Sequence, residues 1–550
     1  MMKKIYLTAA AALMTVVATA QNLDPTVEVT RTYEGKLTDV HKPSFEMAVP
    51  DTVQSFKLDF DYSVFDSPYK GSYEFNPYIM SMKPAETTEK VRNLYLRAGA
   101  GFTLHPTLDL VWSPDLGKDA LSLDVYAANR SYVGKYKALG RADDWKGYDV
   151  ANKVGADMRC RWRKATMTFE TYYSGIAEKD YMKKRAYDSV NARFTLSSNR
   201  AWPEHFLYDL DLSYRFAEDK TDYASDRYVM EHNLRMDATF GPAFNKSHKI
   251  LFDVDFELDT YSHALNAVVA DMGFVPHYVY NSGRLHLDIG VRLSLIMPSV
   301  TSAPLYQTKG FFVYPDLIAS YTLIKDAMKL YAMMGGGNRL NTYASLIERN
   351  HHLDMAYGRG IYGILDSTVE TGSAAVGLEG RVFKVLRYNF RGGYANYANA
   401  PLDTVVEGPE AGTYLPALGY TQYQKCFASL DWELKLQSVR FDGALLYTYA
   451  WGEDPGFLKP ADLIGNASFE YNWKRRVMAG VDCEFATGRR GDSPVAVPGY
   501  ADLGIYGEYA FNRMLSFWLR GGNLLNMTIQ RNVLFAEKGM NFTAGICLNF

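Results

Sequence analysis

Strict alternation of apolar and polar residues, repeated in run after run, is the feature of this sequence that most constrains its fold. Residues 541–550 place five apolar side chains on one face, and 94–104, 250–258 and 285–295 alternate in the same way. Period-two alternation is typical of β-strands with two different faces. Many of the runs reach about 10–13 residues, which exceeds the roughly 5–6 residues usual in globular proteins and suits a tilted crossing of a bilayer. The pattern therefore predicts an all-β fold, a transmembrane antiparallel β-barrel with an apolar exterior and a polar lumen.

Counting the runs and the turns between them predicts about 22 strands. The predicted strands are 93–104, 107–114, 120–130, 151–162, 165–175, 188–198, 206–217, 226–240, 248–260, 272–280, 283–296, 310–323, 328–338, 372–383, 385–397, 419–434, 437–450, 463–474, 476–487, 500–511, 514–523 and 541–550. Long connections, such as 131–150, 339–371 and 398–418, all follow odd-numbered strands, and the connections after even-numbered strands are short. Outer-membrane barrels have short periplasmic turns and long external loops, so this regularity supports the count.

Residues 1–20 have the pattern of a secretory signal peptide. Residues 3–4 are lysines, 5–18 form an uncharged and mostly apolar run, and 18–20 read Ala-Thr-Ala, a cleavage pattern of small residues. The apolar run is shorter than the roughly 18–20 residues of a membrane helix. We predict that this segment is removed on export and that the mature chain resides in the outer membrane.

Residues 21–92 do not continue the alternation. They contain six prolines and a single alternating run at 56–62. A segment of this length with so many prolines is too small for a substantial core of its own. We predict a periplasmic or lumenal N-terminal segment, acting as a reduced plug or a linker, ahead of a barrel that spans 93–550.

Three short stretches resemble parts of the barrel domain of TonB-dependent receptors. Residues 513–526 (RMLSFWLRGGNLLN) resemble the penultimate strand and its turn, 539–550 resemble the closing strand, and 314–321 resemble a recurrent strand of these barrels. The resemblance implies uptake or passage of a solute across the outer membrane. The chain departs from that family at its N-terminus, because 21–92 is too short for a standard plug domain.

A five-residue stretch near the predicted mature N-terminus also resembles a feature of that family. Thr26, Val27, Glu28, Val29 and Thr30 are similar to the short extended segment that these receptors offer to TonB by strand addition. An ordinary extended linker is the alternative, because alternating Val and Thr arise easily by chance. The resemblance implies a periplasmic TonB-like protein as a partner.

Charged residues on the polar faces are predicted to line a hydrated lumen. They are Arg159, Arg161, Asp209, Asp211, Arg215, Arg235, Asp253, Asp255 and Arg292. Same-face carboxylates two positions apart, such as 482 and 484, lie about 6.6 Å apart, because a strand rises about 3.3 Å per residue. That spacing falls in the range of glycosidase pairs, but rows of this kind are typical of a barrel wall. With no Ser-His-Asp set singled out, we predict a non-enzyme with no catalytic residues and no cofactor.

Two local patterns suggest binding chemistry but fit loops better. Residues 358–363 match G-x-G-x-x-G, yet they lie in a predicted long loop instead of between a strand and a helix. His351 and His352, with Asp354 nearby, are predicted to point to opposite sides of an extended, solvated loop and to bind no metal. The four cysteines are far apart in the sequence and indicate neither a disulfide framework nor a metal site.

Two functions remain open at this point. The first is a transport barrel whose external loops capture a solute. The second is a barrel subunit of an outer-membrane assembly for protein insertion, secretion or surface display, with other subunits as partners. A wide barrel without a plug would leak, so the loops, residues 21–92 or another protein must close it. The net charge of −3 gives no support for nucleic-acid binding, and outer-membrane lipid is the expected surrounding.

Overall fold

The computed structural model describes most of residues 93–550, within one compact unit that spans Lys90–Phe550. The predictions for 1–20, for 21–92 with residues 26–30, for Asp354 and for 358–363 concern parts outside the described residues, and they stay predictions. The further gaps in the description are 103, 118–119, 138, 140–144, 180–183, 199–205, 222–227, 299–307, 354–364, 384 and 408–413.

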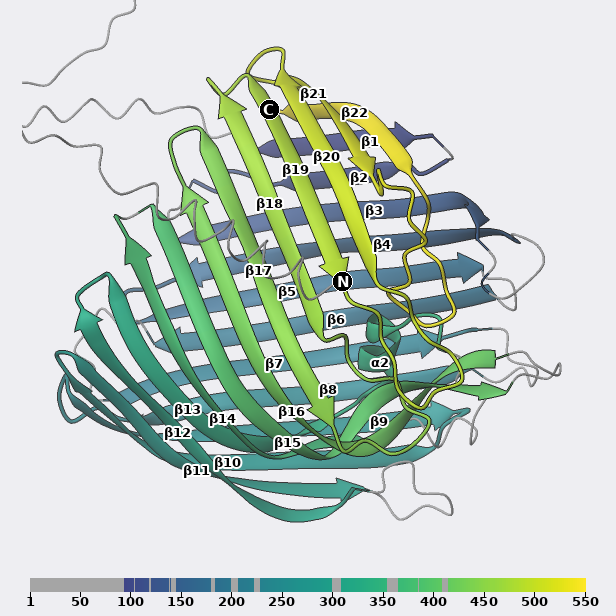
Figure 1. Cartoon of the computed structure of the whole chain (residues 1–550). Helices are drawn as coiled ribbons and strands as arrows, with labels where there is room; N and C mark the ends of the chain where they lie inside the picture. Colours follow the sequence, from purple (N-terminus) through teal and green to yellow (C-terminus); the bar gives the residue numbers. More distant parts are fainter. Residues whose placement is uncertain are drawn as a thin grey trace, which may run out of the picture. The chain divides into compact units, whose positions relative to one another are not determined.

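The described residues form one sheet of 22 strands (Figure 1). The strands are β1 Leu94–Gly101, β2 Thr107–Trp112, β3 Leu121–Tyr136, β4 Trp145–Arg161, β5 Ala165–Lys179, β6 Lys184–Ser198, β7 Phe206–Asp219, β8 Val229–Pro242, β9 His248–His263, β10 Ala267–Ser282, β11 Leu285–Pro298, β12 Gly310–Ile324, β13 Met328–Leu340, β14 Ser367–Val382, β15 Leu386–Glu407, β16 Tyr414–Lys435, β17 Val439–Trp451, β18 Leu463–Trp473, β19 Val477–Ala486, β20 Tyr500–Ala510, β21 Leu515–Gly522 and β22 Asn541–Asn549. A single described helix, α2, spans Tyr343–Arg349. Every predicted strand overlaps one of these strands, and the predicted 22-stranded barrel is confirmed.

The sheet closes on itself where the last strand meets the first. β22 pairs antiparallel with β21 on one side and with β1 on the other. Beyond the strands, the backbone N–H of Phe550 donates to the carbonyl of Leu94 at 2.8 Å, and the N–H of Leu94 donates to the carbonyl of Phe550 at 3.0 Å. Closure leaves no sheet edge with unpaired backbone groups, which is the condition for placing a sheet in a lipid bilayer.

The two ends of the barrel differ in the length of their connections, as predicted. One end, here called the short-turn end, carries tight turns such as 283–284 and 325–327. The other, the long-loop end, carries connections such as 341–366 and 523–540.

The predicted long loops at 131–150, 176–187, 261–271 and 398–418 are wrong, because most of their residues are strand. β3 and β4 extend through most of 131–150, and β15 and β16 extend into 398–418, with 22 residues each. The predicted limits follow the length of a bilayer crossing. Antiparallel pairing continues beyond that length, because each added residue pair still gains ladder hydrogen bonds.

The outward side of the strands is apolar. Exposed apolar side chains on the strands include Val154, Phe169, Val190, Leu212, Ile250, Phe274, Ile289, Val313, Leu330, Val376, Phe390, Leu430, Leu446, Ile464, Val481, Ile505, Phe517 and Ile546. At the short-turn end the exposed aromatics include Trp162, Phe206, Phe244, Phe383, Trp473 and Phe511. An apolar band flanked by aromatic residues is typical of a barrel surrounded by lipid.

Two further observations bear on the covalent and membrane features of the chain. All four cysteines are free, and Cys426 is exposed whereas Cys547 is buried. Among the described residues, no helix combines the length and the apolarity needed to span a membrane.

Glycines on both sides of the closing seam make room for a tryptophan. Gly99 of β1 lies opposite Gly545 of β22, and Gly545 lies opposite Trp518 of β21. A Cβ added to Gly545 would lie 2.0 Å from the carbonyl oxygen of Ala98 and 2.7 Å from the Trp518 ring. The guanidinium carbon of Arg97 lies 4.4 Å from the centroid of the same ring, a favourable cation–π geometry. The two glycines therefore allow an aromatic side chain to pack flat across the seam.

We expect Gly545→Ala to destabilise the closed barrel by about 1–3 kcal/mol, because the added methyl group overpacks the seam against backbone. The matched control is Gly507→Ala in β20, where an added Cβ would meet no atom within 4 Å. The measurement is the denaturant midpoint of the folded barrel in detergent. Equal midpoints for the two variants would contradict the importance of this contact.

Candidate functional site

One part of the connection between β13 and β14, residues 341–353, turns inward at the long-loop end and packs against the barrel wall. This segment, here called the inward loop, contains α2 (Figure 1). Tyr343, Ala344, Leu346 and Ile347 of this helix are buried. They form one apolar cluster with wall residues that include Tyr187, Ala217, Val229, Tyr261, Ala267, Val269, Ile296, Leu340 and Leu418.

The side on which α2 packs follows from the alternation along β6 to β9. Exposed apolar residues of these strands, such as Val190 and Leu212, occupy even positions. The wall residues that surround α2, such as Tyr187, Ala217 and Tyr261, occupy odd positions. Because successive side chains in a strand point to opposite faces, α2 lies on the lumen side of the wall.

The local sequence explains why a helix forms here. Thr342 precedes the helix, and its hydroxyl accepts a hydrogen bond from the N–H of Ser345 at 3.2 Å. Threonine at this capping position typically contributes about 1 kcal/mol to helix stability. Tyr343, Leu346 and Ile347 are spaced three and four residues apart and therefore share one face. This helix signal lies within the predicted loop 339–371, for which the sequence analysis predicts no helix.

Asp219, a buried acidic residue of β7, forms a hydrogen bond with the first residue of the helix. The Tyr343 hydroxyl donates a hydrogen bond to Asp219, whose carboxylate lies 3.8 Å from the Arg185 guanidinium. The side chains of Asp219 and Arg185 are 0% and 1% exposed. Arg185 also donates to the carbonyl of Leu353 at the end of the inward loop. The wall thus contacts both ends of the loop through one buried ion pair.

A second buried carboxylate, on β8, binds the helix backbone. Glu231 accepts the N–H of Ala344 at 2.7 Å and lies 3.3 Å from Arg215. Arg215 in turn donates to the Thr342 hydroxyl at 2.8 Å. A carboxylate at the first turn of a helix is favourable, because the free N–H groups there carry partial positive charge.

The far end of the helix contacts a second part of the barrel wall, β15. Arg349 donates to the carbonyl of Pro401 at 3.2 Å and lies 3.7 Å from the carboxylate of Asp403 on β15. Asp403 also pairs with Arg489 at 2.6 Å. The inward loop therefore connects β6–β8 to β15 across part of the lumen.

A turn after α2 brings the side chains of His351 and His352 together. The N–H of Leu353 donates to the carbonyl of Asn350 at 3.2 Å, and the Asn350 side chain accepts the N–H of His352 at 3.0 Å. The rings of His351 and His352 lie 4.2 Å apart between centroids, and both face Glu178 of β5. Burial, followed by the charge of neighbouring His352, lowers the pKa of His351 below its ordinary value.

The prediction that these histidines point to opposite sides of an extended loop is wrong. It assumed an extended backbone, whereas 350–353 is a tight turn in which consecutive side chains converge. Glu178, His351 and His352 offer ligand atoms that all lie within 4.8 Å of one another. Sequence reasoning missed Glu178, because it lies far from the histidines along the chain.

Several of the charged residues predicted to line the lumen contact polar partners on other strands, whereas Arg235 contacts Asp237 on its own strand, β8. The contacts are Asp211 with Arg193, Arg215 with Glu231, Arg235 with Asp237, Asp253 with Thr239 and His277, and Asp255 with Arg292. Asp255 reaches Arg292 of β11 across Gly273 of β10, where an added Cβ would lie 2.1 Å from its carboxylate. The other three, Arg159, Arg161 and Asp209, lie opposite uncharged residues in their ladders. Their lumenal orientation stays a prediction.

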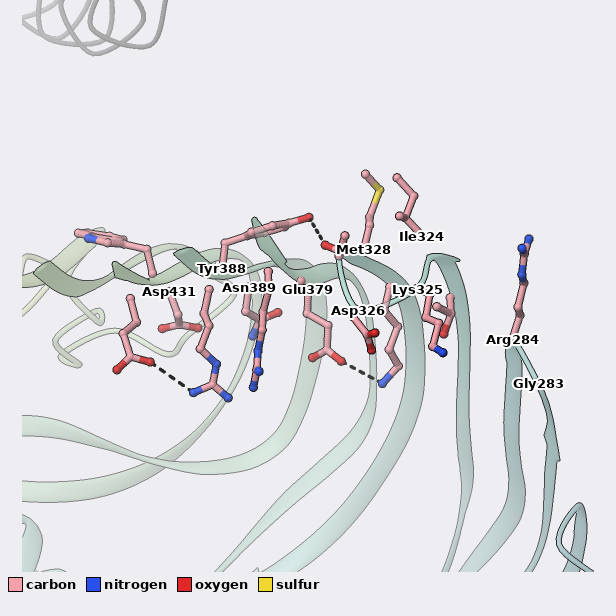
Figure 2. A pocket seen from close by; sticks show the side chains of 18 residues that line it. Gly283, Arg284, Ile324, Lys325, Asp326, Met328, Glu379, Tyr388, Asn389 and Asp431 are labelled. Carbon is pink, nitrogen blue, oxygen red and sulfur yellow. Dashed lines mark hydrogen bonds and ion pairs between the residues drawn. The ribbon is translucent and has the colours of Figure 1, made fainter. Parts of the chain in front are cut away.

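A separate hollow of about 1180 Å³ lies at the short-turn end, between the turns of β10 to β16. Figure 2 shows residues that line it, among them Lys325, Glu379 and Asp431. Lys329 pairs with Glu379 at 2.9 Å, and Arg387 pairs with Glu433 at 3.3 Å. These side chains are partly exposed, and ion pairs of this kind contribute about 0–1 kcal/mol. Such a lining is expected of a hydrated barrel mouth, and we assign it no ligand.

No family model and no curated protein matches this chain. Solved structures do match it. The copper transporter OprC gives a TM-score of 0.62 at 11% identity and covers 84% of this chain and 81% of its own. The FrpB iron transporter from Neisseria meningitidis (F5-1 variant) gives 0.64 at 8%, with 84% and 83% covered. The siderophore receptor PirA from Acinetobacter baumannii gives 0.61 at 11%, with 84% and 81% covered.

These likenesses show the fold of the chain. The closed barrel of 22 antiparallel strands is the barrel fold of TonB-dependent outer-membrane receptors. At 8–11% identity they do not extend to a solute.

We expect Tyr343→Phe to loosen the inward loop without unfolding the barrel. The buried Asp219 carboxylate would lose a donor, which costs about 1–3 kcal/mol, or roughly a 5- to 150-fold shift in the docking equilibrium. The measurement is the rate of amide hydrogen exchange in 343–349.

The matched control for this variant is Tyr388→Phe at the short-turn end, where the hydroxyl donates to the carbonyl of Ala327 at 3.3 Å. It should leave exchange in 343–349 unchanged. Faster exchange throughout the barrel strands of Tyr343→Phe would instead mean that the hydroxyl supports the whole fold.

Proposed function

We propose that this protein is an outer-membrane transport barrel that takes up or passes a solute through its lumen. The observation that carries the proposal is the barrel fold, which it shares with proteins named as metal transporters and siderophore receptors. The large β-barrel and its apolar, aromatic-flanked exterior agree with an outer-membrane location.

The inward loop supports a transport role, because it lies where a solute would enter. α2 is packed inside the long-loop end and is bound to both sides of the wall by Asp219, Glu231 and Asp403. A segment attached through a few side-chain contacts opens at lower free energy than a continuous sheet. We infer that movement of the inward loop regulates access to the lumen.

A TonB-like protein is the proposed source of energy for this movement. The support is the likeness of the barrel to TonB-dependent receptors together with the sequence at 26–30. The alternative is a barrel that stays sealed and serves as a subunit of an outer-membrane assembly. The two functions differ in whether the lumen conducts.

We expect replacement of 343–349 by a Gly-Ser segment of equal length to raise the conductance of the barrel in planar bilayers several-fold. The replacement removes the buried face of α2 and its contacts with both walls, so the lumen at the long-loop end widens. The unmodified protein in the same bilayers is the reference. A barrel that remains non-conducting after the replacement, and that copurifies with other outer-membrane proteins, would favour the assembly function.

We expect deletion of 26–30 to weaken binding of the purified periplasmic domain of TonB to the full chain by at least about tenfold, because strand addition needs the backbone of the added strand. A deletion of equal length at 36–40, in the same N-terminal segment, is the control. Binding that is equal in both deletions, or absent from the unmodified chain, would remove the basis for energised transport through this stretch.

A further inference from the structure

Three side chains with metal-binding chemistry meet inside the long-loop end. They are Glu178 from β5 and His351 and His352 from the turn that ends the inward loop. The Nε2 of His351 lies 3.8 Å from one oxygen of Glu178, and the Nδ1 of His352 contacts the other. One glutamate and two histidines, supplied by two separate segments, form the donor set of many zinc sites.

The geometry requires only small shifts to hold a metal ion. Zinc lies about 2.0–2.2 Å from nitrogen and oxygen ligands, so two tetrahedral ligands lie about 3.4 Å apart. The three ligand atoms already lie within 4.8 Å of one another. Side-chain rotations that move the ligand atoms by about one ångström would bring them to that spacing.

The surroundings order the ligands before any ion binds. The ring of His352 stacks on Phe535, with centroids 3.9 Å apart and planes within 2°. The turn at 350–353 is closed by the Asn350 contacts with His352 and Leu353. Ligands that are already oriented lose less conformational entropy on binding.

The local charge favours a cation. Asp149 of β4 lies directly opposite Glu178 of β5 in the ladder, and like charges at directly opposite positions are unfavourable. Two cations also lie near this cluster: Arg185, which is opposite Glu178 on the other side and contacts Asp219 and the carbonyl of Leu353, and Lys538, whose charge acts on Asp149. A divalent cation between Glu178 and the histidines would relieve the repulsion between the two carboxylates.

We propose that Glu178, His351 and His352 form a binding site for a divalent transition-metal ion that fixes the inward loop to the barrel wall. Mixed nitrogen and oxygen ligands favour Zn²⁺ and similar ions over Ca²⁺ and Mg²⁺, which prefer oxygen alone. The ion would join the loop to β5, at a position separate from the Asp219 and Glu231 contacts. The proposal does not depend on which solute, if any, the barrel transports.

The test is a Zn²⁺ titration of the full, untagged chain in detergent after treatment with a chelator, with bound metal measured by elemental analysis. The unmodified protein should bind one equivalent of Zn²⁺ that Ca²⁺ and Mg²⁺ in excess do not displace. Glu178→Gln and His352→Ala should weaken binding at least about tenfold. His248→Ala, which removes a half-buried histidine at the short-turn end, is the matched control and should bind as the unmodified protein does.

A second measurement separates a metal site from a plain histidine–glutamate contact. Zn²⁺ should slow amide hydrogen exchange in 343–353 of the unmodified protein about tenfold or more and should leave exchange in Glu178→Gln unchanged. This measurement remains valid even where a substitution loosens the loop, because exchange in each variant is compared with and without Zn²⁺. Zn²⁺ binding of equal strength in Glu178→Gln, or no effect of Zn²⁺ on exchange in the unmodified protein, would overturn the proposal.

Discussion

Closure of the β1–β22 ladder is the constraint on which the rest of the structure depends. A sheet in lipid has no water to satisfy backbone groups at its edges, so all 22 strands must pair on both sides. The seam between the chain ends achieves this with Gly99 opposite Gly545, over which Trp518 lies. Once the wall is closed, alternate side chains of each strand face inward, and their charges determine the charge of the lumen.

The inward-facing charged residues hold α2, the only described helix, at a defined position in the lumen. Asp219 and Glu231 are buried on neighbouring strands, and a buried carboxylate is costly unless it is paired and hydrogen-bonded. The pairing comes from Arg185 and Arg215 and from the hydroxyl and backbone donors at the start of α2. The two buried carboxylates would destabilise the wall if they were unpaired, and their pairing with α2 holds the inward loop in one place. Because the loop has few contacts, it opens at lower free energy than the sheet does.

Particular segments show how far sequence reasoning reaches. Alternation identifies every strand, including β22, but it ends β15 too early and starts β16 too late, because hydrogen-bonded hairpins continue past the membrane where no hydrophobic limit applies. Residues 342–349 carry a capping threonine and helical spacing, yet they lie within a long polar connection, which by its length favours a loop. The histidines at 351–352 look like an isolated pair in an extended chain, because no local sequence signal indicates the turn at Asn350.

By itself, the sequence determined the fold class, the number of strands and the difference between the two ends of the barrel, because period-two alternation and turn length are local properties of the chain. Only the tertiary structure decided that the loop after β13 turns inward and that Glu178 meets His351 and His352. Those contacts join residues such as Tyr343 and Asp219, 124 positions apart, and they exist only once the strands have paired in one register. Register and closure are collective outcomes of the whole sheet, and no short stretch of sequence encodes them.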